Sequence, residues 1–193
     1  MNEAPRRQPL LSAGSFRLQF PAVAGLSEPT GRMPSLLMEF EIHVVESPQD
    51  VAAVRGLWEE YWASLGLEPE FQGFAEESRN LPGIYGRPGG LLFIARQSDK
   101  AVGTIALRPL DQHSCEVKRL FILPELRGKG LGRALLDQLI IGARSMGYQK
   151  IYGDSLPSMV EAQRLYRSFG FRQAGAYSAT PTPGAIHLEL ILT

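Results

Sequence analysis

The chain has little cysteine, no net charge and no long hydrophobic run. Its single cysteine, Cys115, excludes an internal disulfide bond and a zinc site built from several cysteines. The 20 Lys and Arg residues balance 20 Asp and Glu residues, which argues against a broadly basic protein that binds nucleic acid. No run of about 18 apolar residues is present, so the sequence predicts no membrane span. The three histidines are scattered, so no metal site is expected either.

The residues that are present describe an ordinary globular protein. Hydrophobic residues make up 44 % of the chain and charged residues 21 %, as in folded domains rather than disordered segments. A length of 193 residues suffices for one domain with a buried core and an appended tail. With one cysteine, a reducing, cytoplasmic location is the default expectation.

Residues 1–37 differ in composition from the rest. They hold five of the 14 prolines and show no sustained helix or strand period. Four Arg and two Glu give this segment a charge of +2, so the remainder carries −2. We interpret residues 1–37 as a flexible Pro-rich extension and residues 38–193 as the folded domain. An over-long start, with Met38 as the natural first residue, and an organelle transit peptide are both open, whereas no apolar stretch indicates a secretory signal.

From Met38 onward, hydrophobic residues recur with strand and helix periods. The first half predicts a strand around Phe40–Val44, a helix over Val51–Trp62 begun by Ser47, a poorer helix at Phe71–Asn80, and strands at Leu91–Arg96, Ala101–Leu107 and Cys115–Ile122. The second half predicts a helix at Leu131–Met146, a strand at Lys150–Asp154, a helix at Val160–Phe169, and a strand pair at Phe171–Tyr177 and Ala185–Leu192. The strand, helix and strand in the middle imply a parallel crossover. The expected fold class is therefore α/β with an α+β mixed sheet, mostly antiparallel, with one parallel β-α-β step and flanking helices.

The stretch Arg127–Arg133 lies between a predicted strand and a predicted helix and contains three glycines. Glycine lets the backbone approach a ligand closely. The N–H groups and the dipole of the following helix favour an anion, and the three basic side chains suit a pyrophosphate. The turn is therefore a candidate phosphate-binding loop. The alternative is a glycine-rich connection that only lets a strand meet a helix.

Two familiar phosphate loops do not fit this spacing. A P-loop needs a Lys-Ser or Lys-Thr pair, but Arg133 follows the last glycine. The dinucleotide fingerprint needs glycine at position 133 and a doubly wound parallel sheet, which the antiparallel strands upstream contradict. A third pattern, Arg/Gln-x-x-Gly-x-Gly/Ala, is matched by Arg127, Gly130 and Gly132.

This turn and a second segment resemble the GNAT N-acetyltransferase superfamily. The residues Cys115–Gly130 are similar to the family's fourth strand and loop, and Ala162–Phe171 is similar to its Ala-x-x-Leu-Tyr-x-x-x-Gly-Phe segment. The resemblance runs from about Met38 to Thr193 and is strongest over Glu116–Phe171. It implies a GNAT-like sheet and acetyl-CoA as co-substrate, with the pyrophosphate in the glycine turn.

The resemblance also implies which residues bind the coenzyme. They are Leu120, Phe121, Ile122, Arg127, Gly128, Lys129, Gly130, Leu131, Gly132, Arg133 and Ser158. Backbone groups of Leu120 and Ile122 would bind the pantetheine arm, and an N–H near Ile122 would polarise the thioester carbonyl. The family commonly carries an asparagine where Met159 stands here, so Ser158, or Asp154–Ser155 at the strand end, would substitute for it.

Two residues are implied to move protons. Tyr166 matches the family's tyrosine and would donate its proton to the coenzyme A thiolate, and Glu116 would accept a proton from the substrate ammonium, directly or through water. The alternatives are that Tyr166 packs at a helix end and that Glu116 pairs with Lys118 or Arg119. Because the family often has a bulge in this strand, the sequence leaves the facing of Glu116 open. We expect Cys115 to be a buried small hydrophobe and not a nucleophile.

The acceptor site is expected beside the fourth strand, between the loops at residues 81–90 and 180–184. Its candidate residues are Tyr85, Arg87, Lys118, Arg119 and Tyr177. Among them, Arg87 is more simply a solvated surface charge, whereas Lys118 and Arg119 suit an acidic group on the substrate.

The expected function is transfer of an acetyl group from acetyl-CoA to a primary amine of a small molecule or an amino acid by direct attack. The alternatives are a non-catalytic module that binds or senses acyl-CoA, an acetyltransferase acting on protein amines, and a nucleotide-phosphate binder of another fold. No nucleic-acid or membrane partner is expected, and the choice between a monomer and a homodimer is open.

Overall fold

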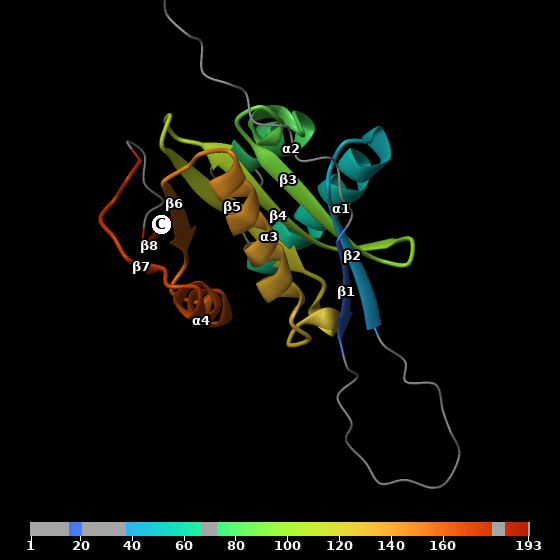
Figure 1. Ribbon diagram of the computed structural model, residues 1–193. Coiled ribbons are helices and arrows are strands. Elements are labelled where there is room, and N and C mark those ends of the chain that lie inside the picture. Colours follow the sequence, from blue (N-terminus) through green and yellow to red (C-terminus); the bar gives the residue numbers. More distant parts are fainter. Residues whose placement is uncertain (1–15, 21–37, 67–72, 179–183, 193) are drawn as a thin grey trace, which may run out of the picture.

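The computed structural model describes residues 16–20, 38–66, 73–178 and 184–192, which form a mixed sheet with helices on both faces (Figure 1). The strands are β1 (Phe16–Phe20), β2 (Met38–Val44), β3 (Leu91–Gln97), β4 (Lys100–Pro109), β5 (Ser114–Ile122), β6 (Lys150–Ser155), β7 (Arg172–Gln173) and β8 (Ile186–Ile191). The helices are α1 (Pro48–Leu65), α2 (Phe74–Arg79), α3 (Leu131–Ser145) and α4 (Val160–Ser168), with short 3-10 turns η2 (Gly83–Tyr85) and η3 (Pro124–Leu126). The strands lie in the order β1-β2-β3-β4-β5-β6-β8-β7.

Capping residues mark the ends of α1 and α3, and Ser47 begins α1 as predicted. The Ser47 side chain accepts a hydrogen bond of 3.0 Å from the Asp50 N–H and so begins α1. Gly66 ends α1 in the left-handed region, with φ 62°. Gly147, with φ 84°, similarly follows the end of α3. None of the described helices combines the length and the apolar character that a membrane crossing requires.

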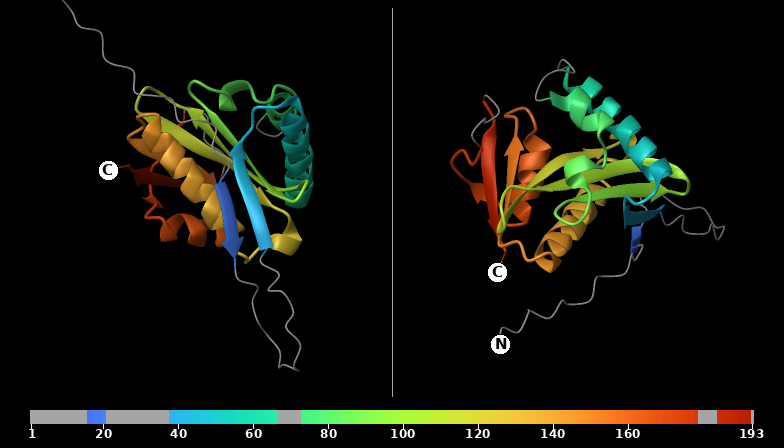
Figure 2. Two further views of the ribbon diagram at one scale, coloured as in Figure 1. Left: turned by 45° about the vertical axis from the view of Figure 1, so that its right-hand side comes forward. Right: turned by 90° about the horizontal axis from the view of Figure 1, so that it is seen from above.

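Two hydrophobic layers hold the helices to the sheet. Helix α3 buries Leu135 and Leu139 completely against one face. Helix α1 and the η2 turn bury Trp58 and Tyr85 against the other face. Burial of each such leucine contributes about 1.5–3 kcal/mol to stability. Seen from above, α1 and α3 lie on opposite sides of the sheet (Figure 2).

The central strands confirm the predicted mixed sheet. Strands β2 to β5 pair antiparallel in sequence, whereas β5 pairs with β6 in parallel, across the connection that contains α3. The β5–β6 ladder runs only from Ser114–Lys150 to Val117–Gly153, although β5 continues to Ile122. The two strands therefore diverge beyond Val117.

One strand was missed at the start of the chain. Phe16–Phe20 forms β1 and pairs antiparallel with β2. Residues 16–20 therefore have strand structure, contrary to what was expected for the Pro-rich segment. The partner is the edge of β2, which the local composition of residues 16–20 cannot reveal. Residues 1–15 and 21–37 lie outside the described residues, so the domain boundary and the start at Met38 stay predictions.

One strand at the other end is much shorter than predicted. Of the stretch Phe171–Tyr177, only Arg172–Gln173 pairs, as β7. The Tyr177 ring instead stacks on Tyr152, with centroids 4.5 Å apart, which takes the chain away from the ladder. The start of the helix predicted at Phe71–Asn80 lies outside the described residues, and its remainder is α2. The other predicted elements are confirmed, with small shifts of their ends.

Candidate active site

The glycine turn leads from η3 into the first residue of α3. Gly128 and Gly130 have φ angles of 76° and 85°, a region that is strained for residues with a side chain. Gly130 is the N-cap of α3 and provides no side-chain cap. The first N–H groups of a helix have no partner within it, and with the helix dipole they attract anions. The turn can therefore hold a phosphate at its backbone.

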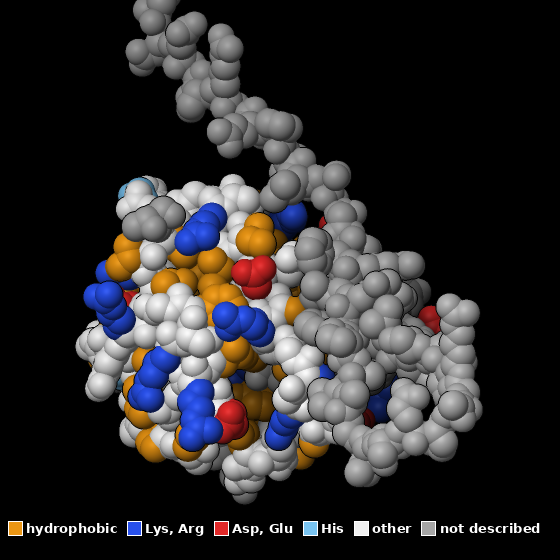
Figure 3. All heavy atoms as spheres, turned by 60° about the horizontal axis from the view of Figure 1, so that its bottom comes forward, with side chains coloured by type: hydrophobic (Ala, Val, Ile, Leu, Met, Phe, Trp, Pro, Cys, Tyr) orange, Lys and Arg blue, Asp and Glu red, His pale blue; other side chains and the backbone are white. Residues whose placement is uncertain are grey.

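Two arginines tie the turn to its neighbours. Nε of Arg127 donates to the Ile122 carbonyl at 3.1 Å, and its guanidinium lies 5.7 Å from the Phe121 ring centroid. Nη1 of Arg133 donates to Oγ of Ser168 on α4 at 3.1 Å. Figure 3 views the molecule from the lower end of Figure 1 and shows Lys and Arg side chains, with some Asp and Glu side chains between them, around a hollow with hydrophobic side chains at its floor.

Gly132 has a packing role within the predicted loop. A Cβ at this position would lie 3.1 Å from Cδ1 of Ile122 and 3.4 Å from Cδ2 of Leu165. The glycine is thus the point where α3 approaches both β5 and α4. Leu131, the first residue of α3, is also buried, whereas Lys129 is exposed.

A β-bulge interrupts β5 next to the point of divergence. The β4–β5 register pairs Ala106 with Lys118 and Thr104 with Phe121, so two residues of β5 face one of β4. One of the two, Arg119, has a φ angle of 56°. Glu116 pairs with Arg108 before the bulge. The Glu116 side chain therefore lies on the same face of the sheet as Arg108, which is the face covered by α1 and η2. The sequence alone leaves this orientation open.

Arg119 is locked into the molecule. Its side chain is 5 % exposed and forms an ion pair with Glu77. Its guanidinium also lies 5.0–5.7 Å from the ring centroids of Trp58, Trp62 and Phe74. Arg119 lines the pocket, but Glu77 already neutralises its charge, so its role in an acceptor site stays a prediction.

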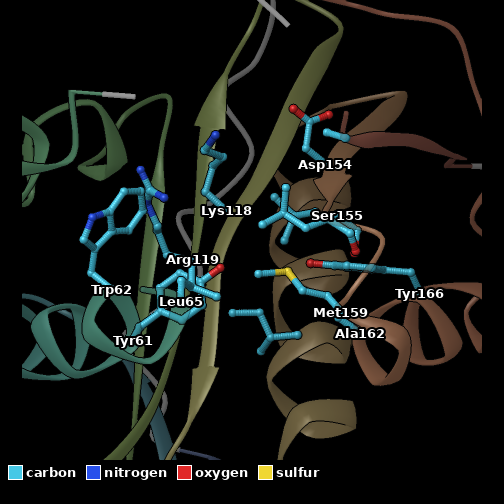
Figure 4. A pocket seen from close by; sticks show the side chains of 14 residues that line it. Tyr61, Trp62, Leu65, Lys118, Arg119, Asp154, Ser155, Met159, Ala162 and Tyr166 are labelled. Atoms are coloured by element: carbon cyan, nitrogen blue, oxygen red, sulfur yellow. The ribbon is translucent and has the colours of Figure 1, made fainter. Parts of the chain in front are cut away.

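A pocket opens in the gap between β5 and β6. Its wall combines residues of both strands with residues of α1, α4 and the connections near them (Figure 4). The lining residues are Tyr61, Trp62, Leu65, Val117, Lys118, Arg119, Leu120, Asp154, Ser155, Leu156, Met159, Ala162, Tyr166 and Ala185. The gap thus brings together chain segments that lie far apart in the sequence.

Tyr166 enters the pocket from α4. Tyr166 as a whole is 5 % exposed, and its hydroxyl points toward the centre of the pocket (Figure 4). Burial raises the pKa of Tyr166, and the neighbouring Tyr61 and Glu116 raise it further. The phenol therefore keeps its proton and can act as a donor.

The β6–α4 connection holds the residue that departs from the family pattern. Met159 lines the pocket at the N-cap of α4, whereas Ser158 is exposed and is not part of the described wall. Nε2 of the buried Gln163 donates to the Leu156 carbonyl at 3.0 Å, which fixes this connection. Of the two proposed substitutes for the asparagine, Asp154–Ser155 is the one that faces the pocket.

Glu116 is buried beside the pocket. Its residue is 1 % exposed, and Oε2 accepts a 2.5 Å hydrogen bond from Nε of Arg108. Oε1 accepts a 2.8 Å bond from the Tyr177 hydroxyl and lies 3.4 Å from Nζ of Lys118. The carboxylate is therefore held by three groups and is not part of the described pocket wall. Its role as a base stays a prediction.

The two tyrosines predicted for the acceptor site occupy different surroundings. The Tyr177 hydroxyl lies between two carboxylates, and burial, Glu116 and Asp154 raise its pKa. Tyr85 is 2 % exposed, packs edge-to-face on Trp58 and donates its hydroxyl to Glu77. Tyr85 thus lies in the hydrophobic core and is not part of the described pocket wall. The loop predicted at residues 180–184 lies largely outside the described residues.

Cys115 has the environment of a packing residue. It is completely buried in the core, and burial raises the pKa of its thiol to about 12, with a contribution from Asp111. Its Sγ donates to the Lys150 carbonyl at 3.6 Å. These contacts agree with the expected small hydrophobe.

Sequence reasoning missed the contribution of α1 to the pocket. Tyr61 and Trp62 lie within the predicted helix Val51–Trp62, for which no site role was expected, and Leu65 is the last residue of α1. The helical period does not indicate which residues of α1 extend past the sheet and line a pocket. The position of these residues near the end of the helix is the one signal that could have found them.

The comparisons with known proteins agree on one family. A family model described as the acetyltransferase (GNAT) family matches residues 52–171. An uncharacterized N-acetyltransferase of Schizosaccharomyces pombe is 34 % identical over 151 residues, which covers 77 % of this chain and 93 % of the relative. The chain therefore belongs to the GNAT family, and it is an acetyltransferase.

Solved structures share the fold. An acetyltransferase from Streptococcus agalactiae superposes with a TM-score of 0.68 at 24 % identity, over 79 % of this chain and 98 % of that one. A GNAT acetyltransferase from Elizabethkingia anophelis, solved with acetyl-CoA bound, gives a TM-score of 0.54 at 19 % identity, over 79 % of this chain and 98 % of that one.

Proposed function

We propose that this protein transfers an acetyl group from acetyl-CoA to a primary amine of a small molecule or an amino acid. The observation that carries the proposal is the Tyr166 hydroxyl in a pocket between two diverging strands. Its helix neighbour Leu165 lies against Gly132 in the first turn of α3, whose N-cap is a glycine. Family membership supports acetyl-CoA as the donor, and a structural neighbour has it bound.

The residues of the turn and of β5 fit such a donor. The N–H groups at the start of α3, with Arg127 and Lys129, would hold the pyrophosphate. Beyond Val117 the β5 edge has left its β6 partner, so backbone groups of Leu120 and Ile122 would bind the pantetheine arm as a strand would. When bound, acetyl-CoA supplies the thioester carbonyl that the amine attacks.

Proton movement would then follow from the pocket residues. The substrate ammonium first loses one proton, to Glu116 directly or through water, because only the neutral amine has a lone pair for attack. The new C–N bond forms as the C–S bond breaks, and Tyr166 gives its proton to the leaving sulfur. A second proton from the attacking nitrogen restores the phenol, so one proton leaves with the base and one with the thiol.

Replacing Tyr166 by Phe tests this role. Thiol release from acetyl-CoA in the presence of an amine panel should fall about 100-fold or more in kcat, within the range for a lost general acid. Binding of acetyl-CoA, measured by calorimetry, should stay close to that of the wild type.

Tyr148→Phe is the matched control, because its hydroxyl donates to the Gly89 carbonyl away from the described pocket wall. A Tyr166→Phe variant as active as this control would reject the acid role. Acetyl-CoA binding without thiol release from any amine would favour a binding or sensing module.

A further inference from the structure

The charged residues of the described pocket wall are divided between two strands. Lys118 and Arg119 belong to β5, and Asp154 belongs to β6. Figure 4 shows the Lys118 ammonium and the Asp154 carboxylate at the same end of the pocket, on opposite sides of the gap. A ligand at this end therefore meets a cation on one side and an anion on the other.

Lys118 provides the positive side. Arg119 is not available in the same way, because Glu77 pairs with it and three aromatic rings surround it. Lys118 lies 3.4 Å from Glu116, but Arg108 bonds the same carboxylate at 2.5 Å. Two cations thus share one anion, which leaves this group with a net charge of +1.

Asp154 provides the negative side. Its Oδ1 lies 2.7 Å from Nδ1 of His187, and the neighbouring Tyr177 hydroxyl is uncharged because its pKa is raised. Asp154 is the one acidic side chain of the described pocket wall, so a ligand at this end meets its carboxylate there. The side chains of Asp154 and His187 are both 16 % exposed, so the charge is fixed in place and still reaches the pocket.

We propose that the acceptor is a free amino acid whose carboxylate binds Lys118 and whose ammonium binds Asp154. The inference rests on the proposed acetyl transfer and names the substrate class for the same pocket. A zwitterion meets both fixed charges with opposite charges of its own. An amine without a carboxylate leaves Lys118 uncompensated and is repelled by it, and so is a protein N-terminus.

Acceptors that share a side chain test the carboxylate site. Thiol release is measured with the common L-amino acids, their amides and the corresponding amines without a carboxyl group. The best amino acid should exceed its amide about 10- to 100-fold in kcat/KM, as expected for a hydrogen bond between charged groups. An amide or simple amine that equals or exceeds every amino acid overturns the inference.

Substitutions of Lys118 and Asp154 test the two binding charges independently. Lys118→Met should remove the preference for the acid over the amide, mainly through KM, and Lys118→Arg should retain it. Asp154→Asn should weaken acids and amides alike, because both present an ammonium. Lys100→Met, whose exposed ammonium pairs with Glu125, is the control. Equal losses for acid and amide in Lys118→Met overturn the assignment of Lys118.

Binding of acetyl-CoA shows whether a negative result rejects the amino-acid substrate or the proposed acetyl transfer itself. The Lys118 and Lys100 variants should bind acetyl-CoA as the wild type does, which also shows that they are folded. Asp154→Asn is left out of this readout, because Asp154 is also a candidate substitute for the family's asparagine. If wild-type protein acetylates other amines but no amino acid, the proposed function stands and the substrate class is wrong. If it neither binds acetyl-CoA nor releases thiol with any amine, the proposed function itself fails.

Discussion

Replacing Arg119 by Met should destabilise the fold because it leaves the Glu77 carboxylate buried without its cation. The two side chains are 5 % and 16 % exposed, so solvent screens the pair poorly. Breaking a buried pair by removing one partner costs about 3–5 kcal/mol. The lost contacts with three aromatic rings are part of this cost. A domain of this size has about 5–15 kcal/mol of stability, so the variant should lose a large fraction of it.

Urea unfolding followed by tryptophan fluorescence measures the loss directly, since Trp58 and Trp62 lie beside Arg119. The double variant Arg119→Met with Glu77→Gln should regain much of the stability, because it removes the stranded charge. The control is Arg164→Met, whose pair with Glu161 is 70 % and 84 % exposed and should matter by less than about 1 kcal/mol.

Two results would refute this reasoning. A loss below about 1 kcal/mol in Arg119→Met would mean that water reaches Glu77 and screens it as at a surface. A double variant no more stable than the single one would mean that aromatic packing, and not the charge pair, dominates the contribution of Arg119.

Three further predictions concern other parts of the molecule. Gly130→Glu should abolish acetyl-CoA binding in calorimetry, because it puts a carboxylate at a helix N-terminus and a side chain at φ 85°; unchanged affinity would contradict the role of the turn. The Cys115 thiol, with a pKa of about 12, should resist iodoacetamide at about pH 8 until the protein unfolds, and rapid labelling of native protein would contradict its burial. Partial burial opposes ionisation of Asp50, but bonds from Arg96 and Ser47 outweigh it and lower its pKa. Its stabilising effect should therefore be present above about pH 4 and disappear as the pH falls through the lowered pKa, so Asp50→Asn should flatten this part of the pH–stability curve.

The elements around the pocket could be predicted because their signals are local. Each signal lies within a single element. They are the alternating residues of the strand that ends at Ile122, the glycines of the turn, and the helical spacing after Leu131. The same holds for Tyr166, whose place on a helix follows from its own neighbours. The family pattern adds the role of this tyrosine, which stays a proposal until Tyr166→Phe is measured.

What could not be predicted depends on distant partners. Arg119 and Tyr85 are typical surface or substrate-contacting residues by type, but both are buried on Glu77, which lies 42 residues before Arg119. The strand Phe16–Phe20 needs the edge of β2, and its own residues do not specify that edge. The position of Tyr177 similarly depends on stacking with Tyr152.

The pocket and its pair of opposite charges have one structural origin. A Cβ at Gly153 would come 2.9 Å from Cγ1 of Val117, so glycine permits the last close pair of the β5–β6 ladder. Immediately beyond it, the bulge bends β5, whereas β6 stays paired with β8 through Asp154 and His187. The strands then separate, and the first residues past the last pair are Lys118 on β5 and Asp154 on β6. The same backbone features that open the gap therefore set a cation and an anion at its entrance, which is why we connect the shape of this pocket with a zwitterionic acceptor.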